Sequence, residues 1–355
     1  MLGKSQTQLS PYLKGEANER RNVQYVAQRI RQIMGTNHNR LDYIVATHVH
    51  ADHVCYAWRG GIWALLENHG FTVGRLIDRD AGVWQDADGD DRYDDGEVTW
   101  RNAGTTSGTA GHWLAYVTNP TNATQLHRET AVAGSTTQID LGPGVTVTVV
   151  ESDAEGVMMA DGLRTVAGDH TTEADRPSEN DYSITLKVSF GSLDYVTGGD
   201  TDGAYDTGYG GYTYNNVETV ISPRIGRVEI LRANHHGSGH STNQTYVDTL
   251  NPDVSIISCG TNTYGHPEQT ILDQLQATSV VYLTAQGDQN RNYANAVIVD
   301  GDILIRSRDG INYTVNGTAY VASGDRTLRE QILERIAQID RELDEPRDLA
   351  ERLPQ

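Results

Sequence analysis

The stretch that decides the fold is Leu41-Asp42-Tyr43-Ile44-Val45-Ala46-Thr47-His48-Val49-His50-Ala51-Asp52-His53. Its first part, residues 41–47, is a short apolar run that predicts a buried strand. The second part gathers three of the chain's 12 histidines and an aspartate. A strand end fixes the backbone, and the loop that follows can turn several side chains onto one point. Imidazole nitrogens and carboxylate oxygens bind Zn²⁺ and related divalent ions, so this loop is a candidate metal site.

Three later segments carry the same kinds of side chain. They are Tyr-Val-Thr-Gly-Gly-Asp at 195–200, Leu-Arg-Ala-Asn-His-His-Gly-Ser at 231–238 and the Tyr-Gly-His-Pro turn at 264–267. With the first loop they give eight candidate metal ligands: His48, His50, Asp52, His53, Asp200, His235, His236 and His266. Adjacent residues at a strand end point to opposite sides. We therefore expect one of His235 and His236 to bind metal and the other to face the substrate or support a ligand, and the sequence does not tell which.

The four motifs HxHxDH, TGGD, HHGS and YGHP, in this order, resemble those of the metallo-β-lactamase superfamily. Within it, they are similar to the ComEC/Rec2-like branch and to the related phosphorylcholine esterases. The resemblance covers roughly residues 20–290. It implies an α+β fold, the αββα metallo-β-lactamase sandwich, with the site at one edge of two sheets. It also implies two divalent metal ions, Zn or Mn, with the Asp200 carboxylate bridging them.

Two departures from the family pattern stand out. Members usually open with a DVGQGD-like segment and an IDGG-like turn ahead of HxHxDH, and this chain has neither. Either its start is truncated or misassigned, or those N-terminal strands are dispensable. Many members also place a further metal histidine before the bridging aspartate, where this chain offers only His170. We interpret His170 as a loop residue, because the branch instead resembles Asn180-Asp181-Tyr182-Ser183, and Asp181 then supports or binds the metal.

The resemblance implies a binuclear metal-dependent hydrolase. Two ions roughly 3.5–4 Å apart lower the pKa of a shared water and create a bridging hydroxide. The catalytic residues would be Asp52, which orients that hydroxide or accepts its proton, and whichever of His235 and His236 is free to protonate the leaving oxygen. The predicted reaction is phosphodiester hydrolysis of a small phosphodiester, nucleotide or single-stranded nucleic acid. The alternative substrate is a lactone, thioester or β-lactam. Further candidate substrate contacts are Ser238, Ser241 and Asn262.

Composition restricts the partners and the location. The formal net charge is −20, and such a surface repels polyanions, so we expect no stable binding to duplex DNA. No stretch approaches the roughly 20 apolar residues of a membrane-spanning helix, and no signal peptide is visible. An Asp-rich chain with only three lysines fits a secreted or extracytoplasmic setting, and a cytoplasmic one stays open. Cys55 and Cys259 either pair once or, as we prefer, remain two buried thiols.

An acidic loop predicts a second cation site. Residues 86–97 place acids at loop positions 1, 3, 5, 9 and 12, a spacing that wraps oxygen ligands around one Ca²⁺. The candidate calcium-binding residues are Asp86, Asp88, Asp90, Arg92, Asp94 and Glu97. Asp91 stands where an EF-hand needs glycine, and no convincing helices flank the loop. The alternative is a solvated acidic loop without an ion.

The chain divides into a hydrolase domain at 1–322 and a helical tail at 323–355. Residues 80–130 are polar and predict an acidic insertion or long loop, and Asp300-Gly301 predicts a hairpin turn within 296–305. In the tail, apolar residues at 4-3-4 spacing predict an amphipathic helix over 327–343. That helix either packs on its own domain or forms a homodimer.

Overall fold

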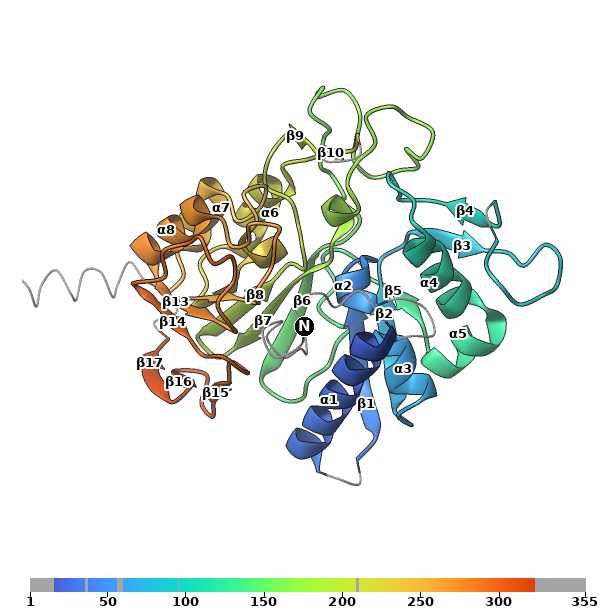
Figure 1. Cartoon of the computed structure of the whole chain (residues 1–355). Coiled ribbons are helices and arrows are strands. Elements are labelled where there is room, and N and C mark those ends of the chain that lie inside the picture. The colour runs from blue at the N-terminus through green and yellow to red at the C-terminus, as the bar shows by residue number, and fades with distance from the viewer. Residues whose placement is uncertain (1–15, 36–37, 56–59, 95, 209–210, 323–355) are drawn as a thin grey trace, which may run out of the picture.

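The computed structural model describes residues 16–35, 38–55, 60–94, 96–208 and 211–322. Two main sheets lie at its centre, and helices cover their outer sides (Figure 1). The first sheet is small and wholly parallel. Its strands, in spatial order, are β1 (Arg40–Ala46), β2 (Thr72–Asp78) and β5 (Glu129–Thr130).

The second sheet has seven strands and a mixed character. Its spatial order is β14 (Ala296–Ile298), β13 (Val280–Leu283), β12 (Val254–Ile257), β11 (Ile230–Arg232), β8 (Leu193–Thr197), β7 (Thr185–Phe190) and β6 (Val145–Glu151). The run from β8 to β14 is parallel, whereas β6, β7 and β8 pair antiparallel. The carboxyl ends of β8, β11 and β12 therefore meet at one edge of the sheet, where ligands usually bind in open α/β sheets.

The two sheets bury their facing sides against each other. Ile77 of β2 packs with Val147 and Val149 of β6 and with Leu186 of β7. Side chains alternate across a strand, so Val150, the next residue of β6, instead joins the cluster under the helices of the large sheet.

Helices form the two outer layers. Three of them cover the large sheet: α6 (Val217–Ile225), α7 (Gln244–Leu250) and α8 (Gln269–Thr278). On the small sheet lie α1 (Glu16–Met34), α3 (Gly61–Glu67), α4 (Gly108–Thr118) and α5 (Pro120–Leu126). Helix, sheet, sheet and helix give the four layers of an αββα sandwich, so the expected fold class is confirmed.

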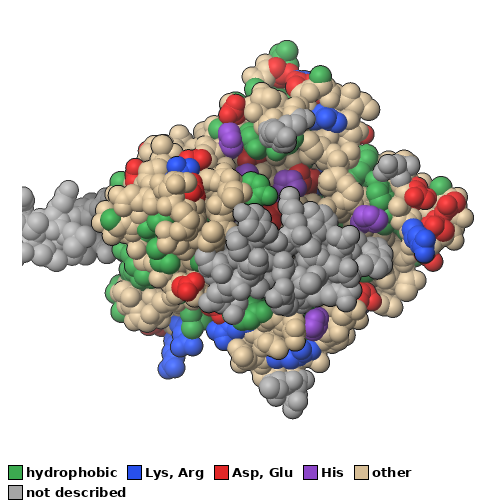
Figure 2. Space-filling model, in the orientation of Figure 1, with side chains coloured by type: hydrophobic (Ala, Val, Ile, Leu, Met, Phe, Trp, Pro, Cys, Tyr) green, Lys and Arg blue, Asp and Glu red, His purple; other side chains and the backbone are tan. Residues whose placement is uncertain are grey.

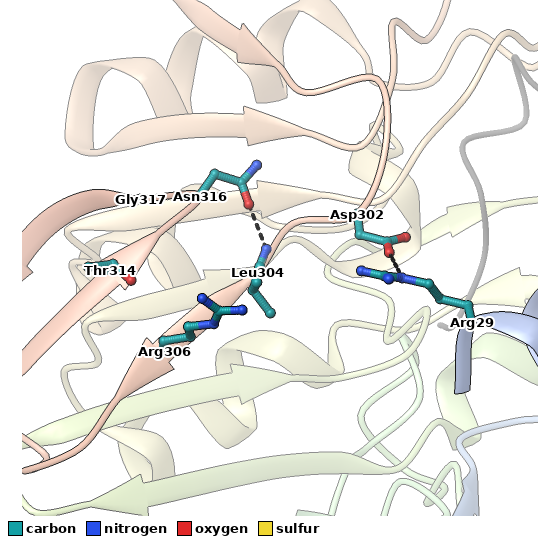
Figure 3. A pocket seen from close by; sticks show the side chains of 7 residues that line it. All are labelled: Arg29, Asp302, Leu304, Arg306, Thr314, Asn316 and Gly317. Carbon is teal, nitrogen blue, oxygen red and sulfur yellow. Dashed lines mark hydrogen bonds and ion pairs between the residues drawn. The ribbon is translucent and has the colours of Figure 1, made fainter. Parts of the chain in front are cut away.

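A third sheet packs against the inner face of the large sheet, on the part of that face that the small sheet does not cover. It consists of β15 (Ile305–Ser307), β16 (Asn312–Val315) and β17 (Thr318–Val321). An ion pair between Arg29 of α1 and Asp302 joins it to the N-terminal part of the chain. A cavity of about 400 Å³ lies there, lined by these two residues and by Leu304, Arg306 and Asn316 among others (Figure 3). None of the candidate metal ligands lines it.

Two local expectations are wrong: the long loop at 80–130 and the hairpin at 296–305. Residues 80–130 contain the hairpin β3 (Gly82–Trp84) and β4 (Val98–Trp100), then α4, α5 and β5, while the alternative of an insertion stays a prediction. The buried Trp113 of α4 shows why, because its side chain fills the space beside the small sheet. Residues 296–305 do not form a hairpin either. Asp300 has the positive φ of a turn, but β14 joins the large sheet and β15 joins the third one.

Other expectations have simpler outcomes. Cys55 and Cys259 form no disulfide. Cys259 is buried, as we preferred, whereas Cys55 is only half-buried, so the expectation of two buried thiols is wrong for Cys55. In the part of the chain that the structure describes, no helix is both long enough and apolar enough to cross a bilayer. The helix at 327–343 lies outside the described residues, and so does the tail, so the domain division and the homodimer stay predictions.

The packing of α8 leads to a stability prediction. Leu272 is fully buried and shares a cluster with Val281 and Leu283 of β13. Leu272→Ala should lower the free energy of unfolding by about 2–5 kcal/mol, because the change leaves a cavity that the core fills only in part. Urea unfolding of the metal-free protein measures it. Leu163→Ala is the matched control, because Leu163 is 84% exposed. Equal losses in the two variants would contradict this account of the core.

Candidate metal centre

The candidate ligands converge where the carboxyl ends of four strands meet. His48 and His50 follow β1, and His53 lies on the short helix α2 (Ala51–Val54). Asp200 follows β8, His235 and His236 follow β11, and His266 follows β12. Although 147 positions separate them in sequence, His53 Nε2 and Asp200 Oδ2 are 3.1 Å apart. Figure 2 shows histidine and acidic side chains together in the recess at the centre of this face.

Asp200 is the centre of the cluster. Its Oδ2 lies 3.1 Å from His53 Nε2, 3.5 Å from His236 Nε2, 3.9 Å from His48 Nε2 and 4.0 Å from His235 Nε2. Burial by itself would raise the pKa of Asp200. The surrounding histidines outweigh that effect and hold the pKa well below its usual range, so this carboxylate stays ionised.

Asp52 completes a compact group of donors. The nearest ligand atoms of Asp52, His53, Asp200 and His236 all lie within 4.8 Å of one another. The side chain of Asp52 is 53% exposed, whereas that of Asp200 is 2% exposed. The imidazoles of His53 and His236 therefore lie between the accessible carboxylate of Asp52 and the buried carboxylate of Asp200.

His48, His50 and His266 extend the group at its two ends. His48 is fully buried, and its Nε2 lies 3.2 Å from His50 Nδ1. Burial, the largest cause, and the neighbouring His53 lower the pKa of His48 well below its usual range. The ring centroid of His266 lies 5.3 Å from that of His235. All eight sequence-predicted ligands are thus brought to one place.

The donor chemistry fits divalent metal ions. Three buried atoms of the cluster have no hydrogen-bond partner within the described structure: Asp200 Oδ1, His236 Nε2 and His266 Nδ1. A buried polar atom without a partner costs roughly 1–3 kcal/mol, and a bound cation would satisfy each of these atoms. Nitrogen and carboxylate ligands suit Zn²⁺ and other first-row ions. The cluster is therefore a candidate metal centre.

The turn that carries His235 and His236 has an unusual backbone. Their φ angles are 46° and 56°, and that of Gly237 is 79°, so three successive residues are left-handed. The left-handed conformation costs roughly 1–2 kcal/mol for each non-glycine residue. This turn replaces the strand end that we expected, and it aims both imidazoles at Asp200. The expectation that they point to opposite sides is wrong.

The outward nitrogens of the two histidines differ in their partners. His236 Nδ1 donates to the carbonyl oxygen of Ser258 at 2.7 Å, which turns Nε2 toward Asp52 and Asp200. Burial by itself would lower the pKa of His236, but the two carboxylates raise it to about 10, so without a metal ion Nε2 carries a proton as well. His235 Nδ1 instead lies 3.2 Å from the amide nitrogen of Asn180. An amide nitrogen only donates, so with Asn180 placed this way the neutral His235 carries its proton on Nε2.

Glycines let the loop after β8 approach its neighbours. A Cβ on Gly199, where φ is 59°, would lie 2.8 Å from Thr47 Oγ1. A Cβ on Gly198 would lie 2.7 Å from Asn234 Oδ1. The two glycines of the TGGD motif therefore place Asp200 between the loop after β1 and the turn after β11.

A buried ion pair holds the loop after β1. Glu179 accepts a hydrogen bond from the backbone amide of Val49 at 2.9 Å, between His48 and His50. The guanidinium of Arg79, 1% exposed, donates two hydrogen bonds to the Glu179 carboxylate. Sequence reasoning missed this pair, because neither residue lies in a motif. Its one signal was the capping box Ser178-x-x-Asp181, which marks the turn carrying Glu179.

The other candidate residues have structural partners. Asp181 accepts from the backbone amides of Ser178 and Asn215 and from the Asn215 side chain, so it supports the turn rather than facing the metal centre. His170 lies 3.0 Å from Glu173 in a loop, as interpreted. All four hydrogen-bonding positions of the Asn262 amide are used within residues 260–266.

The two serines are not surface contacts either. Ser238 is 2% exposed and Ser241 is 1% exposed. The Ser238 hydroxyl accepts from the backbone amide of His240, and that of Ser241 donates to Asp202. Ser238 and Asn262 therefore stabilise their own loops, and Ser241 joins its loop to the one after β8.

The carboxylates of the acidic loop at 86–97 lie close together, an arrangement that fits either a bound Ca²⁺ or a solvated loop. The nearest carboxylate oxygens of Asp86, Asp88 and Glu97 lie within 4.8 Å of one another, as do those of Asp88, Asp90 and Asp94. Glu97 already accepts from the Trp84 indole and from two backbone amides. Figure 2 shows these acids at the edge of the molecule. Calcium binding by this loop, with Arg92 included, stays a prediction.

Comparisons with known proteins give partial likenesses. No family model matches the chain. ComE operon protein 3 of Bacillus subtilis (strain 168) is 33% identical over 117 residues, which cover 33% of this chain and 14% of that protein. Recombination protein 2 of Haemophilus influenzae is 27% identical over 116 residues, covering 32% and 13%. These matches support the predicted resemblance over about a third of this chain, and the chain spans under a sixth of either relative.

A solved structure from Thermotoga maritima is also similar. It is described as a Zn-dependent hydrolase of the metallo-β-lactamase superfamily. The identity is 15%, the TM-score is 0.22, and the match covers 41% of this chain and 58% of the other. The layers and strand order described above carry the fold assignment independently of that likeness.

The pair formed by Arg79 and Glu179 leads to a second prediction. Arg79→Met should lower the free energy of unfolding by about 3–5 kcal/mol, because it leaves a buried carboxylate without its cation. The double variant Arg79→Met/Glu179→Gln should lose clearly less than the sum of the two single variants. Urea unfolding of all four proteins completes the cycle. Additive losses would mean that the two side chains act independently.

Proposed function

We propose that the chain is a metal-dependent hydrolase with two divalent ions, Zn²⁺ or Mn²⁺, acting on a phosphodiester. One observation carries the proposal: histidine and aspartate side chains from two sheets converge, four of them with ligand atoms within 4.8 Å of one another, and buried polar atoms of the cluster lack partners. Such ions would supply Lewis acidity at the scissile group and lower the pKa of the attacking water. The partial likeness to two competence-type proteins agrees with this reading.

The chain's own residues divide the remaining tasks. Asp200, buried and within 4.0 Å of four histidines, is the group that we assign between the two ions. Asp52 is exposed enough to meet water, and its pKa lies below the usual range, so it is ionised and can accept a proton from the attacking water.

We assign the adjacent histidines to different roles. His236, whose Nδ1 is held by the Ser258 carbonyl and whose Nε2 faces Asp52 and Asp200, is the metal ligand of the two, and a metal ion would displace the proton that Nε2 carries in its absence. His235, whose Nδ1 lies beside the Asn180 amide, is the proton donor to the leaving oxygen, and the acid is its imidazolium form. Burial lowers the pKa of His235 and the Asp200 carboxylate opposes that effect, so the ring must gain a proton before it can donate one.

The substrate class follows from charge and from the likeness together. A net charge of −20 disfavours long duplex DNA, so we propose a small phosphodiester, a nucleotide or single-stranded nucleic acid. The second candidate is a lactone, thioester or β-lactam, because the same ions would polarise a carbonyl oxygen. Assays with bis(p-nitrophenyl) phosphate, a chromogenic cephalosporin and a lactone distinguish the two classes.

Removal of metal tests the central proposal. Prolonged chelation should abolish hydrolysis of bis(p-nitrophenyl) phosphate, and Mn²⁺ or Zn²⁺ should restore it, because the attacking water then regains a low pKa. Elemental analysis of the purified chain should find up to two transition-metal ions per molecule. Full activity in a rigorously metal-free preparation would refute the proposal.

The role of His235 predicts a dependence on the leaving group. His235→Ala should lower kcat by about 10²–10⁴-fold on a dinucleotide, whose alkoxide leaving oxygen needs a proton. On bis(p-nitrophenyl) phosphate the loss should be much smaller, because p-nitrophenolate leaves without one. Equal losses on both substrates would make His235 a metal ligand instead.

A further inference from the structure

A second buried glutamate lies behind the metal centre. Glu218, in the first turn of α6, has no exposed surface. Its Oε1 accepts from the Asn234 amide at 2.7 Å and from the backbone amide of Thr242 at 2.6 Å, and its Oε2 accepts from that of Asn243 at 2.7 Å. In the described part of the chain no Lys or Arg forms an ion pair with it. Three N–H donors, rather than a cation, therefore stabilise this carboxylate.

The contacts of Glu218 favour its ionised form. Burial raises the pKa of Glu218 to about 7, and the donated hydrogen bonds oppose that rise. A protonated carboxyl would turn a hydrogen toward groups that are all donors, and one of those bonds would be lost. The neighbouring donors therefore require two acceptor oxygens at this position.

Glu218 is connected to two of the ligand-bearing loops of the large sheet, those after β8 and β11. The backbone amides of Val217 and Glu218 each donate to the carbonyl oxygen of Asp202 at 3.1 Å, two residues beyond Asp200. Close approach is possible because the residue after Asp202 is glycine: a Cβ on Gly203 would lie 2.0 Å from Glu218 Oε2. The first turn of α6 therefore fixes the loop after β8.

The same carboxylate fixes the left-handed turn after β11. Asn234 directly precedes His235, and its side-chain amide donates to Glu218. The backbone amide of Asn234 donates to Thr242 Oγ1 at 3.0 Å, and Thr242 is itself held by Glu218. Glu218 thus anchors the residue before the strained histidine pair in two ways. A strained backbone persists only where its surroundings hold it.

We propose that Glu218 is a positioning residue for the metal centre, setting the separation between Asp200 and the His235–His236 turn. This inference rests on the proposed function, because it assumes that a metal ion binds there. Glu218 itself contacts none of the eight candidate ligands, and it acts through Asn234, Thr242 and the backbone of Asp202. Supporting partners of this kind orient metal ligands, and their loss typically weakens metal binding by about 10–100-fold.

Cobalt binding to the full chain tests the inference. Co²⁺ reports on its ligands through its visible absorption, and titration gives its dissociation constant. Glu218→Gln keeps the size of the side chain but replaces one acceptor oxygen with a donor. We expect about 10–100-fold weaker Co²⁺ binding and an altered cobalt spectrum. Glu151→Gln is the matched control, because Glu151 is an equally buried glutamate, bonded to Arg224 and to the Glu155 amide and not to the ligand loops.

The outcomes separate positioning from stability and from the proposed function. Melting curves of the metal-free variants show how far each substitution destabilises the fold. Weaker Co²⁺ binding and a changed spectrum in Glu218→Gln alone support the inference. An unchanged Co²⁺ affinity and spectrum in Glu218→Gln, or equal changes in both variants, would overturn it while the proposed function stands. A wild-type chain that binds no Co²⁺ would overturn both.

Discussion

The carboxylate of Asp200 lies along the line where the two sheets meet, and imidazoles from both sheets approach it. His48 and His53 come from the loop after β1, whereas His235 and His236 come from the turn after β11. The apolar layer between the two sheets fixes the distance between this loop and this turn. The site therefore depends on holding two independently supported loops within hydrogen-bonding distance of one buried oxygen.

Buried glutamates, rather than apolar packing, give those loops their final shape. Glu179 holds the backbone between His48 and His50, and Arg79 compensates its charge. Glu218 holds the residue before His235, and backbone and side-chain amides compensate its charge. A buried carboxylate with satisfied oxygens accepts few alternative arrangements, because each lost hydrogen bond leaves an unpartnered polar atom. Such groups are therefore well suited to define the positions of loops that carry ligands.

The sequence predicted which side chains converge better than it predicted what holds them in place. The strand ahead of His48 and the clustering of histidines are local patterns, and they identified side chains that the fold brings together. Glu179 and Glu218 belong to no periodic pattern, and their partners are distant in the chain, so they became visible only in three dimensions. The hairpin expected around Asp300 shows a related limit. Asp300 does have the backbone of a turn, but the strands on its two sides belong to different sheets and do not pair with each other. The polar composition of residues 80–130 predicted an acidic insertion or long loop, and it did not reveal that Trp113 gives them a core.

The separation of the donors along the chain has a consequence for folding. His53 and Asp200 are 147 positions apart, and the turn after β11 comes later still. Closing so long a loop costs entropy, and contacts of this kind form late. An emerging chain offers the histidines after β1 well before it offers Asp200, so the complete set of donors exists only after both sheets have packed. A metal ion bound by the full set of donors would then slow the unfolding of the completed fold only. Chains with an occupied centre would be those that have finished folding.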